Sequence, residues 1–503
     1  MGDDFETVVH MLERAMAEAG AREALVCEGE RLTYEDYGRC VAGFAAELKA
    51  MGVAGQRVVL LMGNSIDFCI ALFAVHAAGG QAAALNPLYT ESELRPIVTD
   101  AAPTVILHDA QITPMAEALG RAAGVSHTIA LGADARRLTM WRDEADLHLP
   151  PLPSGDDLAN IQYTGGTTGR AKGAMLTHRA IAVNIGQRDA LAPMRKRAER
   201  LLCVVPLFHV YAMSMCLHST VYCQGTLVIM RRFQAEPVLA ALSKEKITIF
   251  SGSPTLFTSL LGHEGFARVD FSHLRMNTSG GSALPAELLR RFEDVTGAPV
   301  VEGYGQSEAG PVISFNPLEG VRKPMGVGLP IPGGEVQIVD LETGTRVLGP
   351  GEKGEIRVRG PQIMCGYRNL PEETAATLRG GWLYTGDIGE FDEDGYLFIR
   401  DRKKEMVIVS GFNVFPREVE EVLYHHPAVR EAAVVGVPDE RKGEALKAFV
   451  SLRPDAPADE EALRAHCRAK LAGYKVPSFF EIVEDIPKTG VGKIDKKQLR
   501  AEA

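Results

Sequence analysis

The sequence predicts a large α/β domain followed by a small α+β domain. Up to Asp401, continuous apolar runs rich in Val, Leu and Ile alternate with segments of helical spacing. That alternation is typical of parallel or mixed sheets with helices on both faces. The charge cluster DRKKEM then interrupts the pattern, and a compact set of strands and helices follows it. Because domain boundaries fall at such breaks, we expect domains over residues 1–401 and 402–503.

The strands expected in the first domain are short apolar runs bounded by turn residues. They cover residues 57–62, 81–85, 104–107, 201–205, 226–230 and 247–250. Residues 65–77 have helical spacing, and glycines punctuate a more β-rich section over residues 336–358. In the second domain we expect helices over residues 416–424 and 458–471, and strands over residues 432–437, 447–452 and 480–483.

The composition is that of a globular protein without an integral membrane segment. Of 503 residues, 46% are hydrophobic and 24% are charged, and no apolar run approaches the roughly 18–20 residues that cross a bilayer. The 54 basic and 65 acidic residues give a net charge of −11, which argues against nucleic acid as a partner and against constitutive docking on anionic lipid. The acidic N-terminus is unlike a signal peptide, so we expect a cytoplasmic protein with at most peripheral membrane contact.

The eight cysteines are scattered and form no C-x-x-C pair. In a chain of this size, that pattern predicts reduced and mostly buried thiols rather than disulfides or a zinc site. A metal ion is therefore expected only together with a nucleotide.

The stretch YTGGTTGRAKG (residues 163–173) has the composition of a phosphate-binding loop. Glycines allow backbone N–H groups to converge on phosphate oxygens, and the threonines, Arg170 and Lys172 add donors and positive charge. The spacing does not fit G-x-x-x-x-G-K-[ST], because Ala171 precedes the lysine and Gly173 follows it. The alternative is an idle Gly/Thr loop, although such linkers are more often Gly/Ser-rich and uncharged.

Five further segments combine small residues with a few polar groups beside apolar runs. They are PLFHVY (206–211), SGGSAL (279–284), GYGQSE (303–308), YTGD (384–387) and PKTGVGK (487–493). Taken alone, most have an ordinary structural explanation: a lone histidine such as His209 is usually a packed core residue, and a Gly/Thr/Lys tail is often frayed. Glu308 is a carboxylate that suits Mg²⁺, and Asp387 is placed to accept hydrogen bonds from ribose.

Together, the ordered motifs resemble those of the adenylate-forming acyl-CoA synthetases. YTGGTTGRAKG, PLFHVY, GYGQSE, WLYTGD, DRKKEMVIVSGFNV and PKTGVGK occur in the order and approximate spacing of that superfamily. The segment from GWLYTGD to EEVL (381–423) is most similar to bacterial long-chain fatty-acid–CoA ligases. The resemblance implies an acid–CoA ligase that uses ATP, Mg²⁺ and coenzyme A. Acid and ATP would give acyl-AMP and pyrophosphate, and acyl-AMP and CoA would then give acyl-CoA and AMP.

The resemblance also implies a role for each matched residue around the nucleotide. The residues expected to hold the phosphates are Thr164, Gly165, Gly166, Thr167, Thr168, Gly169 and Lys172. Ser307 would contact the α-phosphate, and Glu308 with Thr164 would hold Mg²⁺. The residues expected around adenine and ribose are Gly281, Ser282, Ala283, Tyr304, Gly305, Asp387, Ile399 and Arg402. His209 would line the meeting point of acid and nucleotide, and Lys493 would bridge the acid carboxylate and the α-phosphate.

A mobile C-terminal domain is a further implication of the resemblance. In this superfamily the small domain rotates between the half-reactions, which removes the adenylation lysine and opens a tunnel for the thiol. Lys404 matches the hinge, and Gly411 with Phe412 would line the tunnel. A few residues at a domain boundary commonly absorb such a change in φ and ψ. The setting of Lys493 also resembles that of lysines acetylated for control.

The identity of the acid is less constrained. The expected acyl pocket is lined by His209, Val210, Tyr211, Ser214, Gly280, Gly303 and Val312. These residues are apolar or small, and no arginine or lysine is expected there to meet a second carboxylate. A medium- or long-chain fatty acid is therefore the first candidate, and an aryl or arylpropenoic acid is the alternative. We expect a monomer or a homodimer.

Two other functions remain open from the sequence. The first is an acyl-AMP ligase that loads a carrier protein, although the insertion typical of such relatives is not seen before the C-terminal domain. The second is a nucleotide-binding regulator without catalysis. Against this second function, every position that the chemistry requires is filled, at Thr164, Glu308, Asp387, Arg402 and Lys493.

Overall fold

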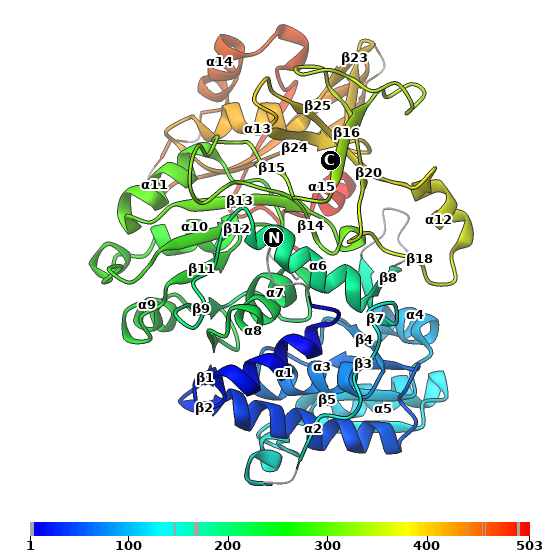
Figure 1. Cartoon of the computed structure of the whole chain (residues 1–503). Coiled ribbons are helices and arrows are strands. Elements are labelled where there is room, and N and C mark those ends of the chain that lie inside the picture. Colours follow the sequence, from blue (N-terminus) through cyan, green and yellow to red (C-terminus); the bar gives the residue numbers. More distant parts are fainter. Residues whose placement is uncertain are drawn as a thin grey trace.

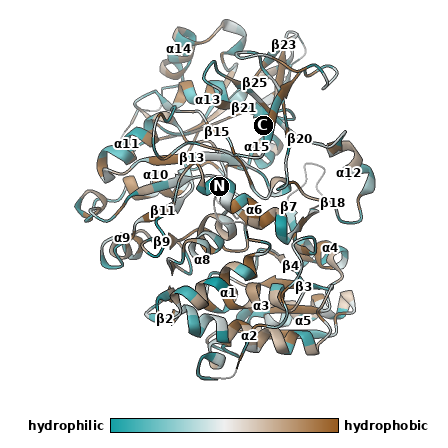
Figure 2. Cartoon of the chain, in the orientation of Figure 1, coloured by the Kyte–Doolittle hydropathy of each residue, from teal (hydrophilic) through white to brown (hydrophobic). Residues whose placement is uncertain are grey.

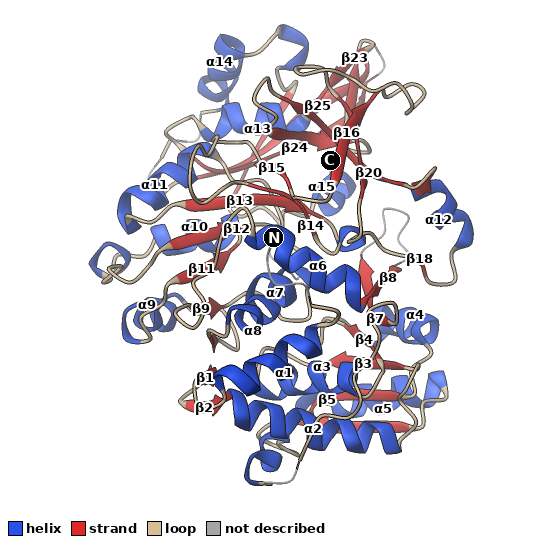
Figure 3. Cartoon of the chain, viewed as in Figure 1, coloured by secondary structure: helices blue, strands red, loops and turns tan. Residues whose placement is uncertain are grey.

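In the part of the chain that the structure describes there are four β-sheets with helices around them, shown in Figure 1 by sequence position and in Figure 3 by secondary structure. The computed structural model describes residues 5–144, 147–164, 171–439, 441–454, 456–457, 459–489 and 493–502. In these ranges, no helix is long and apolar enough to cross a membrane. All eight cysteines are free thiols and only Cys365 is exposed, as the scattered cysteine pattern predicted.

A seven-stranded sheet lies in the N-terminal part, in the order β18-β8-β7-β4-β3-β5-β6. Its strands are β3 (Arg57–Leu61), β4 (Gln81–Ala84), β5 (Val105–Asp109), β6 (His127–Leu131), β7 (Leu158–Thr164), β8 (Lys172–Thr177) and β18 (Gly366–Tyr367). The strands from β3 to β7 pair in parallel, whereas β7 and β8 form an antiparallel hairpin. The helices α4 (Glu91–Ala101) and α5 (Thr113–Ala123) pack on the outer face of this sheet.

A nine-stranded sheet follows, in the order β15-β14-β13-β12-β11-β9-β10-β1-β2. Its strands are β1 (Glu23–Cys27), β2 (Glu30–Thr33), β9 (Arg200–Cys203), β10 (Thr226–Ile229), β11 (Ile249–Gly252), β12 (Met276–Ser279), β13 (Val300–Gly305), β14 (Val312–Phe315) and β15 (Leu329–Pro330). Its outer face is covered by α9 (Ala235–Lys244), α10 (Pro254–Leu261) and α11 (Ala286–Thr296).

The largest apolar core lies between these two sheets. The helices in it are α1 (Val8–Ala19), α2 (Tyr34–Ala50), α3 (Ile66–Ala77), α6 (His178–Asp189), α7 (Val210–Ala212), a π-helix (Met213–His218) and α8 (Ser219–Cys223). Every residue of α3 is buried, and the helix is apolar all round apart from Asp67 and His76, as Figure 2 shows by its brown colour. A helix of that composition belongs inside a large protein rather than on its surface.

A β-rich sheet connects the large sheets to the C-terminal part. Its strands are β16 (Glu335–Val339), β17 (Gly354–Arg359), β19 (Leu378–Arg379), β20 (Trp382–Phe391) and β21 (Leu397–Arg402), and α12 (Pro371–Thr377) precedes β19. The last sheet has strands β22 (Val407–Val409), β23 (Phe412–Val414), β24 (Val429–Asp439), β25 (Gly443–Leu452) and β26 (Phe479–Val483). The helices of this C-terminal part are α13 (Pro416–Tyr424), α14 (Glu460–Lys470) and α15 (Lys496–Glu502).

The expected strands and helices lie within a few residues of the observed ones, and α13 has the predicted bounds. The predicted α/β class and the mixed sheets are confirmed. One difference concerns the charge cluster at Asp401, because β21 runs two residues into it and ends at Arg402. The domain division at residues 401 and 402 stays a prediction.

Candidate active site

The base of the glycine-rich loop is a strand hairpin. Thr164 ends β7 and Lys172 begins β8, and the two are directly paired across the hairpin. The predicted phosphate ligands Gly165, Gly166, Thr167, Thr168 and Gly169 lie outside the described residues. The Lys172 ammonium forms an ion pair with Glu373 and lies 5.3 Å from the ring centroid of Tyr367. The loop therefore starts and ends on fixed backbone with a cation beside it.

Glu308 lies close to that hairpin through Tyr367. It sits in a short 3₁₀ helix (Ser307–Ala309) that directly follows β13, and both Ser307 and Glu308 are buried. The Tyr367 hydroxyl donates to Glu308 Oε1 at 2.8 Å, while the same ring faces Lys172. Sequence reasoning missed Tyr367, which reaches this place because β18 pairs with β8.

The donor set around Glu308 fits Mg²⁺ better than a transition metal. No cluster of three or more His, Cys, Asp or Glu side chains occurs in the part of the chain that the structure describes. Mg²⁺ needs only one or two carboxylates, because phosphate oxygens and waters complete its coordination. The buried carboxylate of Glu308 and the hydroxyl of Thr164 are oxygen ligands of the required kind.

A second polar group is centred on Asp387, whose exposed fraction is 5%. Its Oδ2 accepts hydrogen bonds from the Tyr304 hydroxyl at 2.6 Å and from Gln306 Nε2 at 3.1 Å. Its Oδ1 lies 3.5 Å from Arg402 Nε, and the two residues are direct partners on β20 and β21. Burial raises the pKa of Asp387, and the Arg402 guanidinium opposes that rise.

The residues predicted to flank adenine include two glycines, Gly281 and Gly305, whose backbone lies close to other atoms. Gly281 has φ +86°, and a Cβ there would meet Lys493 Cε at 3.4 Å. Ser282 is exposed and Ala283 half-buried in the same turn. At Gly305 a Cβ would lie 1.9 Å from the Pro311 carbonyl oxygen, so only glycine fits there.

Lys493 reaches this group from the C-terminal part of the chain. Its backbone is fixed to Thr489, whose N–H donates to the Lys493 carbonyl at 2.7 Å. Burial and the Arg402 guanidinium lower the pKa of Lys493 to about 8, although Asp387 acts in the opposite direction. Burial, with a contribution from Lys493, lowers the pKa of His209 to about 3. The ammonium, the imidazole, Gly281 and the Asp387–Arg402 pair therefore share one site.

Most of the predicted acyl-pocket residues lie where the helix after His209 meets β12. His209 is the N-cap of α7 and its Nδ1 accepts from the Tyr211 N–H at 3.2 Å. The Tyr211 hydroxyl lies 3.2 Å from Thr278 Oγ1, and a Cβ at Gly280 would lie 2.3 Å from the Tyr211 ring. Val210 and Ser214 are buried beside them.

The other two predicted pocket residues lie on β13 and β14. A Cβ at Gly303 would lie 2.2 Å from the Phe315 ring. Val312 exchanges two hydrogen bonds with Asn184 of α6, at 2.8 and 2.9 Å. These bonds fix α6 against β14, the strand next to the edge of the nine-stranded sheet.

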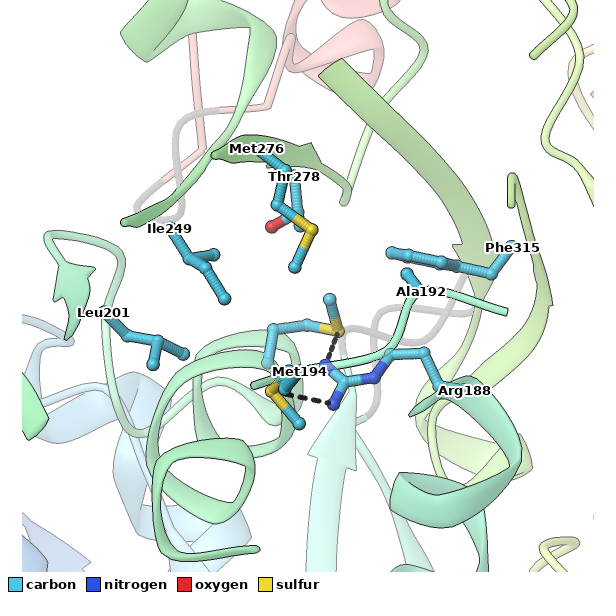
Figure 4. A pocket seen from close by; sticks show the side chains of 9 residues that line it. Arg188, Ala192, Met194, Leu201, Ile249, Met276, Thr278 and Phe315 are labelled. Atoms are coloured by element: carbon cyan, nitrogen blue, oxygen red, sulfur yellow. Dashed lines mark hydrogen bonds between the residues drawn. The ribbon is translucent and has the colours of Figure 1, made fainter. Parts of the chain in front are cut away.

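Beside these residues lies a cavity that contains an arginine, which the sequence analysis did not expect (Figure 4). Its lining includes Met194, Met215, Met276, Phe315 and Thr278, together with Arg188. Arg188 bears on the expectation that no arginine or lysine is placed there to meet a second carboxylate. That expectation considered only the segments that carry motifs, whereas Arg188 comes from α6.

The predicted hinge and tunnel residues lie in the chain that follows β21. Lys404 is in an exposed turn. Partial burial of its ammonium, together with the Arg402 guanidinium, lowers its pKa. Ser410 (φ +53°) and Gly411 (φ +85°) form the turn between β22 and β23. Phe412 is half-exposed and stacks on Tyr474 with ring centroids 4.7 Å apart. Among the described residues, no hydrogen bond or ion pair joins Gly411 or Phe412 to Lys493.

Comparison with known families gives two matches along the chain. The AMP-binding enzyme family matches residues 12–368, and the AMP-binding enzyme C-terminal domain matches residues 418–493. A long-chain-fatty-acid–CoA ligase of Bacillus subtilis (strain 168) is 38% identical, over 99% of this chain and 94% of the relative. A feruloyl-CoA synthase of an Amycolatopsis species is also 38% identical, over 94% of each chain.

Solved structures are also similar to this chain over nearly its whole length. ATP-bound MatB from Rhodopseudomonas palustris has a TM-score of 0.91 at 30% identity, over 98% of each chain. An anthranilate CoA ligase in complex with anthranoyl-AMP has a TM-score of 0.92 at 28% identity, over 100% of this chain and 98% of that one. Both similarities span both parts of the molecule.

Proposed function

This chain belongs to the AMP-binding enzyme family and is an AMP-forming acid–CoA ligase, and on that premise we propose how its residues divide the two half-reactions. The first half-reaction converts acid and ATP into acyl-AMP and pyrophosphate. The second transfers the acyl group to the thiol of CoA and releases AMP. The adenylate is needed because a free carboxylate has no good leaving group, whereas AMP leaves readily.

The first half-reaction brings a carboxylate anion to a polyanion, so its barrier is largely electrostatic. Lys493 supplies the positive charge between the acid carboxylate and the α-phosphate. The observation that carries this proposal is the position of Lys493, whose Cε lies against Gly281 and whose charge acts on His209. Its lowered pKa of about 8 keeps the ammonium largely protonated at neutral pH.

The nucleotide is held at three places in this proposal. Thr164 and Lys172 bind phosphates together with the glycine-rich loop, and Ser307 contacts the α-phosphate. Asp387 and Arg402 bind the ribose hydroxyls beside Ile399, with a carboxylate as acceptor and a guanidinium as donor. Tyr304, Gly305 and the Gly281–Ser282–Ala283 turn flank adenine. His209, largely buried and neutral, lines the place where acid and nucleotide meet.

Mg²⁺ fits this site through Glu308 and Thr164, and when bound it would neutralise phosphate charge. The chain's own contribution is to hold the Glu308 carboxylate in place. The Tyr367 hydroxyl does so by donating to Oε1 at 2.8 Å. The other carboxylate oxygen of Glu308, Oε2, would then coordinate Mg²⁺.

For the second half-reaction we propose that the chain beyond Lys404 rotates about this residue. The rotation withdraws Lys493 and brings Gly411 and Phe412 to the thiol path. Such hinges are a few residues at the end of an element that absorb a change in φ and ψ. The placement of Lys404 in an exposed turn directly after β21 supports this assignment.

The acid has an apolar body in this proposal, bound between Val210, Tyr211, Ser214, Gly280, Gly303 and Val312. A medium- or long-chain fatty acid is the first candidate, because the similar curated relatives include long-chain-fatty-acid–CoA ligases. An aryl or arylpropenoic acid is the second, and it is favoured by the similarity to a feruloyl-CoA synthase. A cytoplasmic monomer or homodimer and acetylation at Lys493 remain predictions.

The direct test is pyrophosphate release from ATP with a panel of acids, with and without CoA. We expect a single turnover without CoA and continuous turnover with it. Continuous release without CoA would contradict thioester formation as the second step. If none of the acids supports release, the chain does not activate carboxylic acids and the proposal fails.

A further inference from the structure

A buried arginine with no acidic partner among the described residues lines the cavity beside the region proposed for the acid. Arg188 is in the last turn of α6, and its exposed fraction is 4%. Figure 4 shows its guanidinium pointing into the cavity between Phe315 and the methionines. The cavity wall is otherwise apolar apart from Thr278.

The partners of the Arg188 guanidinium are weak. Nη1 lies 3.2 Å from the sulfur of Met215, and Nη2 lies 3.8 Å from the sulfur of Met194. Nε has no partner among the described residues. A thioether sulfur is a poor acceptor, whereas a guanidinium offers five N–H donors. Most of the hydrogen-bonding capacity of this side chain is therefore unused.

The adjacent carboxylate of Asp189 acts on this charge without a direct contact. Asp189 is adjacent in sequence, but its Oδ1 accepts from the Met194 N–H at 2.9 Å. Within the described chain, no ion pair joins Asp189 or any other acid to Arg188. A buried charge is normally paired, because removing it from water is costly. The missing acceptor is expected to come from a molecule that enters the cavity.

The cavity and the reaction site lie along the same strand. Met276 begins β12 and lines the cavity, while Gly280 and Gly281 follow the end of β12. β12 is extended only over Met276–Ser279, so it spans about 10 Å between the cavity and the turn that holds Gly280 and Gly281. Lys493 Cε lies 3.4 Å from where a Cβ at Gly281 would be, at one end of this path, and Arg188 lines the cavity at the other.

Tyr211 connects the two ends. Its ring packs on Gly280 next to the reaction site, and its hydroxyl lies 3.2 Å from Thr278 Oγ1 in the cavity wall. An acid whose carboxylate lies at Lys493 would pass along the Tyr211 ring and place its other end in the cavity. The cavity has a free volume of only about 10 Å³, so Met194, Met215 and Met276 must move to admit such a tail, and methionine side chains are flexible enough to do so.

We propose that the acid carries a second oxygen acceptor at the end opposite its carboxylate and that Arg188 donates hydrogen bonds to this oxygen. The inference rests on the proposed function, whose acid it specifies. The acceptor is a hydroxyl or a carboxylate oxygen on an apolar chain or an aromatic ring. Arg188 is thus a residue that determines specificity, and an unsubstituted fatty acid leaves it unpaired.

A purely structural role makes a different prediction. A cation in the last turn of a helix is stabilised by the helix dipole, and Arg188 has that position in α6. If this were its whole role, replacing it would alter stability or affect every acid to the same extent. Recognition of a distal oxygen would instead change the ranking of the acids.

The test compares matched acids by pyrophosphate release with ATP and CoA. The pairs are octanoate with 8-hydroxyoctanoate and octanedioate, and cinnamate with 4-hydroxycinnamate. We expect the wild-type kcat/KM to be about tenfold or more higher for the oxygenated member of at least one pair, the range of a hydrogen bond to a charged group. Comparing 8-hydroxyoctanoate with octanedioate tells whether a hydroxyl or a carboxylate is the preferred acceptor.

The matched variant is Arg188→Met, which keeps an unbranched apolar stem in a cavity already lined by methionine. It should remove the preference by raising KM for the oxygenated acid, and it should leave kcat/KM for the unsubstituted acid within about threefold. Equal loss for all acids, or a wild-type preference for the unsubstituted member of every pair, overturns the proposal. If the variant does not fold, the wild-type ranking alone decides. Activity with unsubstituted acids only would refute the inference but leave the proposed function standing.

Discussion

Lys493 carries its charge in a place where that charge titrates near physiological pH. Burial and Arg402 lower its pKa to about 8 from the 10.5 of a free lysine side chain. A lysine that bridges two anions in the adenylation step must be protonated, so its proton is part of the catalytic machinery. The anions themselves raise its pKa once they bind, because opposite charges favour the charged form.

Adenylation should therefore lose efficiency above about pH 8. In the free enzyme Lys493 is protonated below its pKa of about 8 and neutral above it, so kcat/KM for pyrophosphate exchange is expected to fall as pH rises through that value. The matched variant is Lys493→Arg, whose guanidinium stays charged throughout this range. It should show no such alkaline limb. A limb that persists in the arginine variant would assign the titration to another group.

Removing the Lys493 ammonium should separate the two half-reactions. In Lys493→Ala we expect pyrophosphate exchange to fall by about 10²–10³, the usual cost of losing one electrostatic contact to a transition state. Thioester formation from supplied acyl-AMP and CoA should stay near the wild-type rate. Equal losses in both assays would show that Lys493 is not specific to adenylation.

The contact between Gly280 and Tyr211 makes a third prediction at this scale. A methyl group at residue 280 would lie 2.3 Å from the Tyr211 ring, so Gly280→Ala should displace the ring and raise KM for the acid about tenfold or more. KM for ATP should change little. Gly186→Ala is the control, because a Cβ there meets nothing within 4 Å. A normal KM for the acid in Gly280→Ala would remove Tyr211 from the acyl pocket.

At the scale of elements, the pair of strands β20 and β21 determines where the C-terminal part can begin to move. Asp387 pairs with Arg402 in register, and the Lys403 N–H donates to the Gly386 carbonyl at 2.8 Å. Lys403 Nζ also lies 2.9 Å from Glu355 on β17. Lys404 is thus the first residue beyond these contacts, and its N–H donates no hydrogen bond to any described residue.

A proline at residue 404 should stop the rotation without disturbing this arrangement. Lys404→Pro fixes φ and removes an N–H that makes no hydrogen bond here. We expect acyl-AMP formation to stay within a few-fold of wild type and thioester formation to fall by two orders of magnitude or more. Lys404→Ala keeps a free φ and should support both steps, as measured by pyrophosphate exchange and by acyl-CoA production. Equal loss of both steps in Lys404→Pro would place the hinge elsewhere.

The elements that the sequence predicted are those whose pattern is local. The apolar runs of β3, β9 and β10 and the spacing in α3 and α13 are visible within a few residues of chain. The helix α15 was missed because it follows a Gly/Thr/Lys segment that reads as a polar tail. The π-helix after His209 was missed because its long apolar run, MSMCLH, has no helical period.

For the site residues, too, those that belong to a local sequence pattern were predicted. Those in glycine-rich motifs, such as Lys493 and Asp387, were identified from the resemblance to a family. Tyr367, Gln306 and Arg188 were not, since each acts through a partner distant in sequence. The hydroxyl of Tyr367, for example, reaches Glu308 across 59 positions, and no local pattern reports such a contact.

At the scale of the whole molecule, the helical layer between the two large sheets holds three buried histidines. His76 of α3 lies with its ring centroid 5.1 Å from that of His178 at the start of α6, and His218 ends the π-helix. Burial lowers the pKa of His76 to about 4, of His178 to about 2 and of His218 to about 3. All three are therefore neutral in the folded protein at pH 7.

This layer should make the protein sensitive to acid. The unfolded chain binds protons at these histidines near pH 6.5, whereas the folded protein does not until much lower pH. Stability is therefore complete above pH 6.5 and falls as pH decreases below it, down to about pH 4 where His76 begins to charge. Three such groups give a slope of up to about 4 kcal/mol per pH unit. Urea midpoints at several pH values between 7 and 5 measure this slope.

A single substitution tests the assignment. His218→Leu should reduce the slope by up to about 1.4 kcal/mol per pH unit, because one proton-binding difference is removed. His273→Gln, at an exposed histidine, is the control and should leave the slope unchanged. An unchanged slope in His218→Leu would assign the acid sensitivity to other groups.

Asp387 and Arg402 both precede the proposed hinge, on neighbouring strands of one sheet. A ribose bound by this pair keeps its contacts whichever position the C-terminal part takes. The nucleotide is then expected to remain in place after pyrophosphate departs and to leave only once the acyl group has been passed on. AMP should accordingly inhibit in competition with ATP and not with CoA, so that the order of product release is determined by a rigid sheet rather than by the part that moves.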